Sequence, residues 1–181
     1  MELKSKKLLQ QTLQITTILV THDQREAMTL ADTIVVMADG KVQQIGPPTE
    51  IYRAPANRFV ATFIGQSNLL AAEVADRRQV RLMGQLFEVE AMPDSLRAGD
   101  GVALSIRPED IRIVRQGGGD RNTLPARFIF VRDVGGSIEF RLDCAGHEII
   151  GTSSPAAWAG TDIDAAVAVE LPAAACTILA G

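Results

Sequence analysis

Two stretches of the chain contain side chains that could take part in chemistry, and the first is centred on His22. His22 follows the β-branched run ITTILV (15–20), and Asp23 with Glu26 three residues later resembles the capping box that begins a helix. The free N–H groups and the dipole at such a start favour an anion, so His22 is placed to sense a phosphate or to position an attacking water. Taken alone, a histidine at a strand end is more often structural.

The second stretch is SIRPEDI (105–111), which contains Arg107, Pro108, Glu109 and Asp110. Its pattern is a strand stopped by a proline, then an acidic turn, then a new alternating strand. We expect Arg107, Glu109 and Asp110 to provide turn chemistry and a local ion pair. A ligand-binding role for the three is the less favoured alternative, because surface pairs of this kind are common and weak.

The remaining candidates have weaker patterns. Cys144 and Cys176 have no metal-ligand spacing, and we expect both to be small apolar core residues in a reducing compartment. His147 follows a turn glycine and is expected to be exposed, while Trp158 and Tyr52 are expected to pack rather than bind. No metal site is predicted.

The elements that must position these residues change character near Gly65. Before it, helical and strand patterns alternate over short distances, and Asp39-Gly40 supplies the positive-φ dipeptide of a hairpin turn. Two strands, 15–20 and 33–37, read as buried on both faces, as in the interior of a parallel sheet. The other predicted elements are helices over 1–13, after Asp23, over 47–52 and after Asn57, and a strand over 41–45.

After Gly65 the hydrophobic period becomes two, as in the alternating run 138–144. Many short strands at this spacing predict a small barrel or sandwich. The glycine-rich run 117–120 is expected to be a surface loop, because no phosphate-loop pattern surrounds it. The predicted strands are 69–74, 80–82, 85–89, 102–106, 111–114, 126–131, 138–144, 148–152, 167–171 and 176–179.

Composition restricts the partners. The net charge of −4 and an aromatic fraction of 4% argue against a nucleic-acid surface, which needs a basic stripe and stacking rings. No run approaches the roughly 18 apolar residues that a membrane span needs. We therefore expect a soluble, cytoplasmic protein whose connection to a membrane comes through a partner.

Both stretches resemble parts of one family. The run ITTILVTHDQREAMTLADTIVVMADGKVQQIGPPTEIYRAPANRFVATFIG resembles the end of the ATPase domain in ATP-binding-cassette (ABC) importers of sugars, polyamines and ferric iron. SIRPEDI resembles the R-P-E-D signature of the TOBE domain that these ATPases carry, an OB-like barrel built on tandem units. The implied fold is α+β: a truncated α/β remnant of the cassette ATPase domain in residues 1–65, followed by an all-β, OB-like TOBE barrel in residues 66–181.

The resemblance implies that His22 is the switch histidine, which contacts the γ-phosphate of ATP in the full-length parent. It implies ATP and Mg as the parent's cofactors, and the transmembrane permease and a second ATPase subunit as partners. The location implied is cytoplasmic, peripheral on the inner face of the cell membrane. The barrel is implied to be regulatory and to stabilise the dimer.

The sequence has no G-x-x-x-x-G-K-[ST] loop, no L-S-G-G-Q signature and no Walker B segment, so we expect the chain alone to be inactive and to bind no cofactor. Its unpaired apolar strands predict self-association. The alternative function is a stand-alone small-ligand-binding β-barrel.

Overall fold

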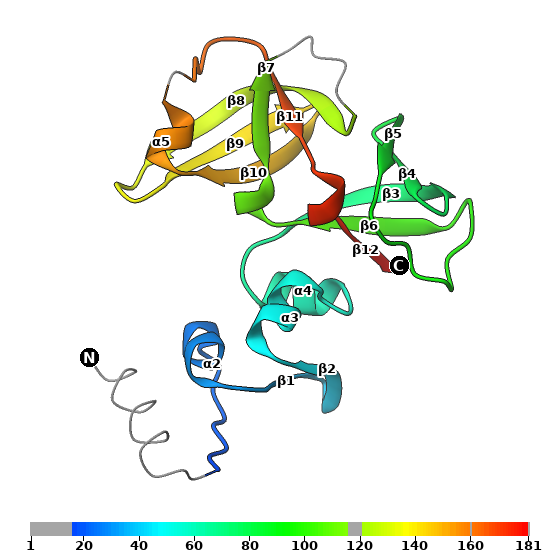
Figure 1. Cartoon of the computed structure of the whole chain (residues 1–181), viewed down its shortest axis with the longest axis vertical. Helices are drawn as coiled ribbons and strands as arrows, with labels where there is room; N and C mark the ends of the chain where they lie inside the picture. The colour runs from blue at the N-terminus through cyan, green and yellow to red at the C-terminus, as the bar shows by residue number, and fades with distance from the viewer. Residues whose placement is uncertain (1–15, 116–120, 160, 181) are drawn as a thin grey trace. The chain divides into compact units, whose positions relative to one another are not determined.

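The computed structural model describes residues 16–115, 121–159 and 161–180. The chain divides into two compact units, Met1–Gly65 and Gln66–Gly181, each with its own hydrophobic core (Figure 1). The predicted helix over 1–13 and the predicted loop over 117–120 lie outside the described residues.

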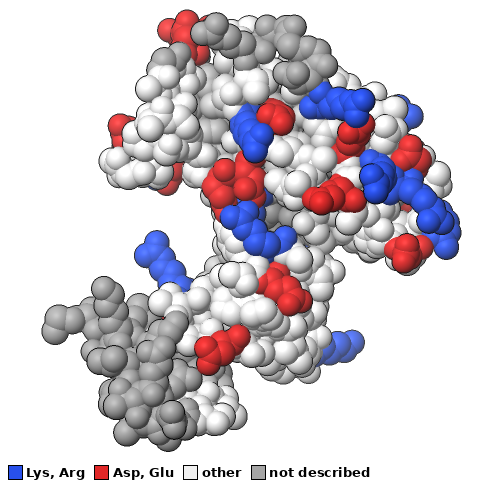
Figure 2. Space-filling view, in the orientation of Figure 1, with Lys and Arg blue, Asp and Glu red and all other residues white. Residues whose placement is uncertain are grey.

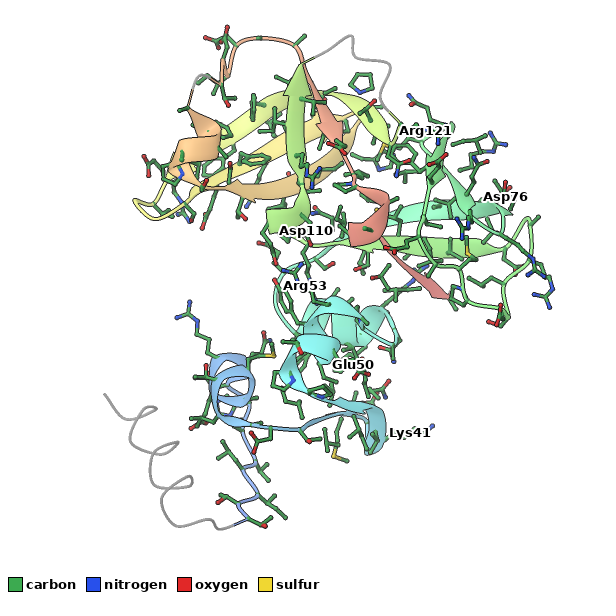
Figure 3. The ribbon with its side chains drawn as sticks, in the orientation of Figure 1. Lys41, Glu50, Arg53, Asp76, Asp110 and Arg121 are labelled. Carbon is green, nitrogen blue, oxygen red and sulfur yellow. The ribbon has the colours of Figure 1, made fainter. Side chains whose placement is uncertain are left out.

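Local sequence signals set the boundaries of the elements in the first unit. The Asp23 side chain caps α2, and the Asn57 side chain caps α4 by accepting a hydrogen bond from Val60 N. Asp39 and Gly40 adopt positive φ angles of 50° and 72°, as a two-residue hairpin turn requires. The elements are α2 (Gln24–Leu30), β1 (Ile34–Ala38), β2 (Lys41–Gly46), α3 (Pro48–Arg53) and α4 (Arg58–Phe63); Lys41 marks the hairpin turn in Figure 3.

The predicted strand over 15–20 is wrong for the part that the structure describes. Residues 16–20 belong to no strand, and the side chains of Ile18 and Val20 are 90% and 93% exposed. An extended segment becomes a strand only when a neighbour pairs with its backbone. Within the described residues no strand pairs with this segment, although its apolar composition suits a sheet interior.

The β1–β2 hairpin has one covered face and one bare face. Ile34 and Val36 of β1 are buried and pack with residues of α3 and α4. On the other face, two cross-strand pairs, Val35–Ile45 and Met37–Val42, are 51–57% exposed. The prediction that the strand over 33–37 is buried on both faces is therefore wrong for this second face, which we call the bare hairpin face.

The second unit contains two five-stranded antiparallel sheets, and each β run predicted after Gly65 corresponds to one of their strands. The first sheet has the order β12-β6-β3-β4-β5 and the second the order β10-β9-β8-β11-β7 (Figure 1). The strands are β3 (Asn68–Asp76), β4 (Gln79–Leu82), β5 (Gln85–Glu88), β6 (Gly101–Ile106), β7 (Arg112–Arg115), β8 (Thr123–Asp133), β9 (Ile138–Cys144), β10 (His147–Ser153), β11 (Val167–Glu170) and β12 (Thr177–Ala180).

The two sheets repeat one topology and exchange their last strands. In chain order, β3-β4-β5-β6 of the first sheet corresponds to β8-β9-β10-β11 of the second. A short 3₁₀ turn follows each half, η1 (Pro108–Asp110) after β6 and η2 (Ala173–Ala175) after β11. After η1 the chain continues as β7, which pairs with β11 of the second sheet, and after η2 it continues as β12, which pairs with β6 of the first. Each half therefore completes the sheet of the other.

A single apolar core joins the two sheets of the second unit. At one end, Trp158 of the short helix α5 (Pro155–Trp158) lies 5.4 Å, centroid to centroid, from the rings of both Phe128 and Phe140. The expectation that Trp158 packs is confirmed. Gly151 is required beside this cluster, because a Cβ there would lie 2.3 Å from the Phe140 ring.

Candidate functional site

The Thr21-His22-Asp23 segment is held by hydrogen bonds at the start of α2. Thr21 Oγ1 accepts from Asp23 N–H at 3.0 Å, and Asp23 Oδ1 accepts from the N–H groups of Arg25 and Glu26 at 2.8 and 3.2 Å. The predicted cap is thereby confirmed. His22 lies in a bend between these groups with its side chain exposed to solvent, and its role in phosphate contact stays a prediction.

The R-P-E-D stretch forms a tight turn. Pro108, Glu109 and Asp110 make the 3₁₀ turn η1, closed by a hydrogen bond from Asp110 N–H to the Arg107 carbonyl oxygen at 3.0 Å (Figure 3). Pro108 is buried, Glu109 is exposed and Asp110 is half-buried. The predicted turn is confirmed. The local ion pair and the ligand-binding role of these residues both stay predictions.

Arg107 is more buried than turn chemistry requires. Its side chain is only 4% exposed, and Nη1 donates to the carbonyl oxygen of Gln66 at 3.1 Å. A guanidinium can be buried only when hydrogen bonds replace those of water. Arg107 therefore fixes the backbone that leads into β3, a role that sequence reasoning missed. The available signal was its position at the end of the apolar strand 102–106.

The same place holds two further polar contacts. The hydroxyl oxygens of Ser67 and Ser105 are 2.8 Å apart, and Ser67 Oγ also donates to the Ile106 carbonyl oxygen at 3.3 Å. With Asn68, which begins β3, and Arg107, these serines form what we call the β3–β6 polar cluster. Three of its members, Asn68, Ser105 and Arg107, are among the buried polar residues of the described chain.

Asn68 links the two sheets by imitating a backbone group. Its Nδ2 donates to the Ile150 carbonyl oxygen at 2.8 Å, and its Oδ1 accepts from Ile150 N–H at 2.8 Å. Nδ2 also lies 3.4 Å from the Ile106 carbonyl oxygen. Strand β10, to which Ile150 belongs, is the edge of the second sheet. The asparagine side chain therefore bonds the outer edge of β10, with which no further strand of the described residues pairs.

Asn122 repeats this arrangement at the other sheet edge. Its Nδ2 donates to the carbonyl oxygens of Glu88 and Leu171 at 2.7 and 3.0 Å, and its Oδ1 accepts from Glu88 N–H at 2.6 Å. Glu88 ends the edge strand β5, as Ile150 lies in the edge strand β10. In the sequence, the two asparagines could have been recognised as equivalent from a short repeat, Asn-x-Leu-x-Ala, at 68–72 and 122–126. The halves differ elsewhere, since Pro172 occupies the place of Arg107.

Both cysteines are unreactive core residues. Cys144 and Cys176 are buried and free. Burial raises the pKa of each thiol to about 12, with a smaller contribution from the neighbouring carboxylate, Asp143 or Asp110 respectively. Because the thiolate is the nucleophile and the metal ligand, burial and the raised pKa keep these thiols protonated and weakly reactive near neutral pH. The prediction that they are core residues is confirmed.

Several charged side chains of the second unit form pairs of opposite sign. Arg127 pairs with Asp143 at 2.9 Å and Arg132 with Glu139 at 2.6 Å, both across neighbouring strands. On the face shown in Figure 2, basic and acidic side chains are intermixed over residues 66–181. Among the described residues no group of three or more His, Cys, Asp or Glu side chains could hold a metal ion. None of the described helices is long and apolar enough to cross a bilayer.

The chain is similar to known proteins over both of its units. Residues 104–179 match the family model of the TOBE domain. The chain is 41% identical over 148 residues to the spermidine/putrescine import ATP-binding protein PotA 1 of Pseudomonas aeruginosa, a match covering 78% of this chain and 39% of that protein. The matched 78% of the chain is more than residues 66–181 alone make up, so the similarity extends into residues 1–65.

A second relative is named for a different cargo. The sulfate/thiosulfate import ATP-binding protein CysA 2 of Chromobacterium violaceum is 42% identical over 135 residues, covering 74% of this chain and 36% of that protein. The chain therefore spans well under half the length of these relatives. Among solved structures, the cytoplasmic molybdate-binding protein ModG, determined with molybdate bound, has a TM-score of 0.54 at 17% identity, covering 63% of this chain and 96% of that one. This likeness shows the fold alone.

Proposed function

We propose that this chain, which has a TOBE domain at residues 104–179 and is homologous to the ATP-binding subunits of ABC importers, is the C-terminal part of such a subunit. In the whole protein it would help to power solute uptake by ATP hydrolysis. The observation that carries the proposal is the 41% identity to an import ATP-binding protein over 148 residues, which extends beyond the TOBE domain into the unit that contains His22.

The first unit would contribute His22 to the ATPase site. Residues 1–65 would be the C-terminal remnant of the ABC ATPase domain, and His22 would contact the γ-phosphate of ATP held, with Mg, by the rest of the parent. The exposed side chain and the well-bonded turn around it suit a residue that must reach a ligand from a fixed backbone. Arg107, Pro108, Glu109 and Asp110 would serve as the turn that connects the two halves of the barrel.

The partners would be those of an importer ATPase. We expect the parent to work as a homodimer of ATPase subunits on the inner, cytoplasmic face of the cell membrane, attached through the transmembrane permease. Residues 66–181 would form the regulatory and dimerisation barrel. Polyamines are the favoured cargo, because relatives from several bacteria carry the spermidine/putrescine name. The small-ligand-binding barrel stays an alternative prediction.

The proposal predicts what the DNA before the Met1 codon encodes. We expect a phosphate-binding loop G-x-x-x-x-G-K-[ST], an L-S-G-G-Q segment and a Walker B strand, in frame or displaced by a single frameshift, because the motifs of the chain work only with these parts. Sequencing that region is the measurement. Unrelated coding sequence in all three frames would contradict the proposal.

We also propose that the chain by itself associates through the bare hairpin face with a second copy. Val35, Met37, Val42 and Ile45 form two apolar cross-strand pairs there, and pairing two such faces would remove them from water. We expect Met37→Glu to weaken association at least about 10-fold, because a carboxylate would be buried in the contact.

Sedimentation velocity over a concentration series measures this association. The control is Lys41→Ala, at the turn of the same hairpin, which should associate like the unmodified chain, and circular dichroism would confirm that each variant is folded. An unmodified chain that stays monomeric at every concentration, or a Met37→Glu variant that associates equally well, would refute this association.

A further inference from the structure

The two units meet at a junction that is anchored on both sides. Gly65 is the last residue of the first unit, and its N–H donates to Gln24 Oε1 at 2.9 Å. Gln66 is the first residue of the second unit, and its carbonyl oxygen accepts from Arg107 Nη1 at 3.1 Å. No residue separates these two anchors. The chain therefore passes from one unit to the other without a free linker residue.

The residues that flank the junction are held as well. Before it, Ile64 is buried in the core of the first unit, and its N–H donates to the Val60 carbonyl oxygen at 3.0 Å. After it, Ser67 and Asn68 are bonded within the β3–β6 polar cluster. Gly65 itself has a φ of +74°, in the left-handed region that favours glycine.

Gln24 connects this junction to the segment around His22. It is the first residue of α2, two positions after His22, and it follows Asp23, whose side chain caps the helix. The Gln24 side chain reaches across 41 residues of sequence to Gly65. A movement of the Thr21-His22-Asp23 segment that displaces the start of α2 would therefore strain this hydrogen bond.

We propose that Gln24 is a positioning residue that transmits changes at the His22 segment through Gly65 and Gln66 to Arg107 and the β3–β6 polar cluster. This inference rests on the proposed function, since it takes His22 to respond to the γ-phosphate of ATP. The connection consists of one neutral hydrogen bond on the Gln24 side and one charge-assisted bond on the Arg107 side. The neutral bond limits the coupling to about 2- to 10-fold.

The first test uses the 181-residue chain and hydrogen exchange observed by NMR. We expect Gln24→Ala to speed exchange of the Gly65 amide by about 2- to 10-fold and to shift the amide resonances of Gln66 and Ser67. Gln24→Glu keeps an acceptor oxygen and should restore both. Arg25→Ala, on the neighbouring exposed residue of the same helix, is the control. Unchanged Gly65 exchange, or resonance shifts confined to residues 16–65, would overturn the inference.

The second test uses a full-length relative with glutamine at the position aligned with Gln24. Addition of ATP should change hydrogen exchange in the segment aligned with 66–68, and the alanine variant should reduce that response by about 2- to 10-fold while basal ATP turnover is kept. The glutamate variant should restore the response. An undiminished response in the alanine variant would overturn the inference. An alanine at the position aligned with His22 that leaves turnover intact would instead overturn the proposed function.

Discussion

Replacing Asn68 with leucine is expected to lower the free energy of unfolding of residues 66–181 by about 2–3 kcal/mol. The substitution keeps the approximate size of the side chain but removes its hydrogen-bonding groups. Ile150 N–H and the Ile150 carbonyl oxygen would lose their Asn68 partner at a place where Asn68 is only 6% exposed. The Ile106 carbonyl oxygen would lose one donor and keep the bond from Ser67 Oγ. The edge strand β10 would lose the group that joins it to β3.

Urea denaturation followed by far-ultraviolet circular dichroism measures this effect. The control is Gln85→Leu on the exposed part of β5, which should change the stability by no more than about 0.5 kcal/mol, as surface substitutions usually do. If Asn68→Leu is as stable as Gln85→Leu, the Asn68 side chain does not stabilise the edge of β10.

The parts of the fold that were predictable depend on neighbours in sequence. The cap at Asp23, the turn at Asp39 and Gly40 and the cap at Asn57 are each made by residues within three positions of the groups they bond, so residue types alone specify them. The strands after Gly65 were predictable for a similar reason, because each has its own two-residue alternation of apolar side chains.

The parts that were not predictable depend on distant residues. The exchange of β7 and β12 between the sheets places strands beside partners far along the chain, and no local pattern distinguishes it from ordinary hairpins. Asn68 and Asn122 look like turn residues in sequence, and only the fold shows that each bonds an edge strand. The predicted strand over 15–20 failed because composition indicates a preference for burial, whereas a strand also needs a partner.

In the candidate site, too, features set by neighbouring residues were predictable and features set by distant contacts were not. The turn formed by Pro108, Glu109 and Asp110 was predictable from the proline and the acidic residues that follow it. The burial of Arg107 and its bond to Gln66 were not, since they depend on a contact 41 residues away. The contact between Gln24 and Gly65, also 41 residues apart, was missed for the same reason.

Substitution of the histidine aligned with His22 is expected to have the largest effect on function. In a full-length relative, alanine at this position should lower ATP turnover at least about 100-fold, the lower end of what a positioned acid–base or phosphate-orienting side chain contributes. ATP affinity should be largely kept, because the phosphates and Mg are held mainly by other parts of the ATPase domain. The control is alanine at the position aligned with Arg25, which should leave turnover unchanged.

Phosphate release and nucleotide binding, measured side by side on these two variants, test most directly the role in ATP hydrolysis that we propose for the His22 position. We expect the relative with alanine at the position aligned with His22 to bind ATP and scarcely hydrolyse it. The relative with alanine at the position aligned with Arg25 should bind and hydrolyse ATP normally. A His22 variant whose turnover matches that of the unmodified subunit would contradict the account.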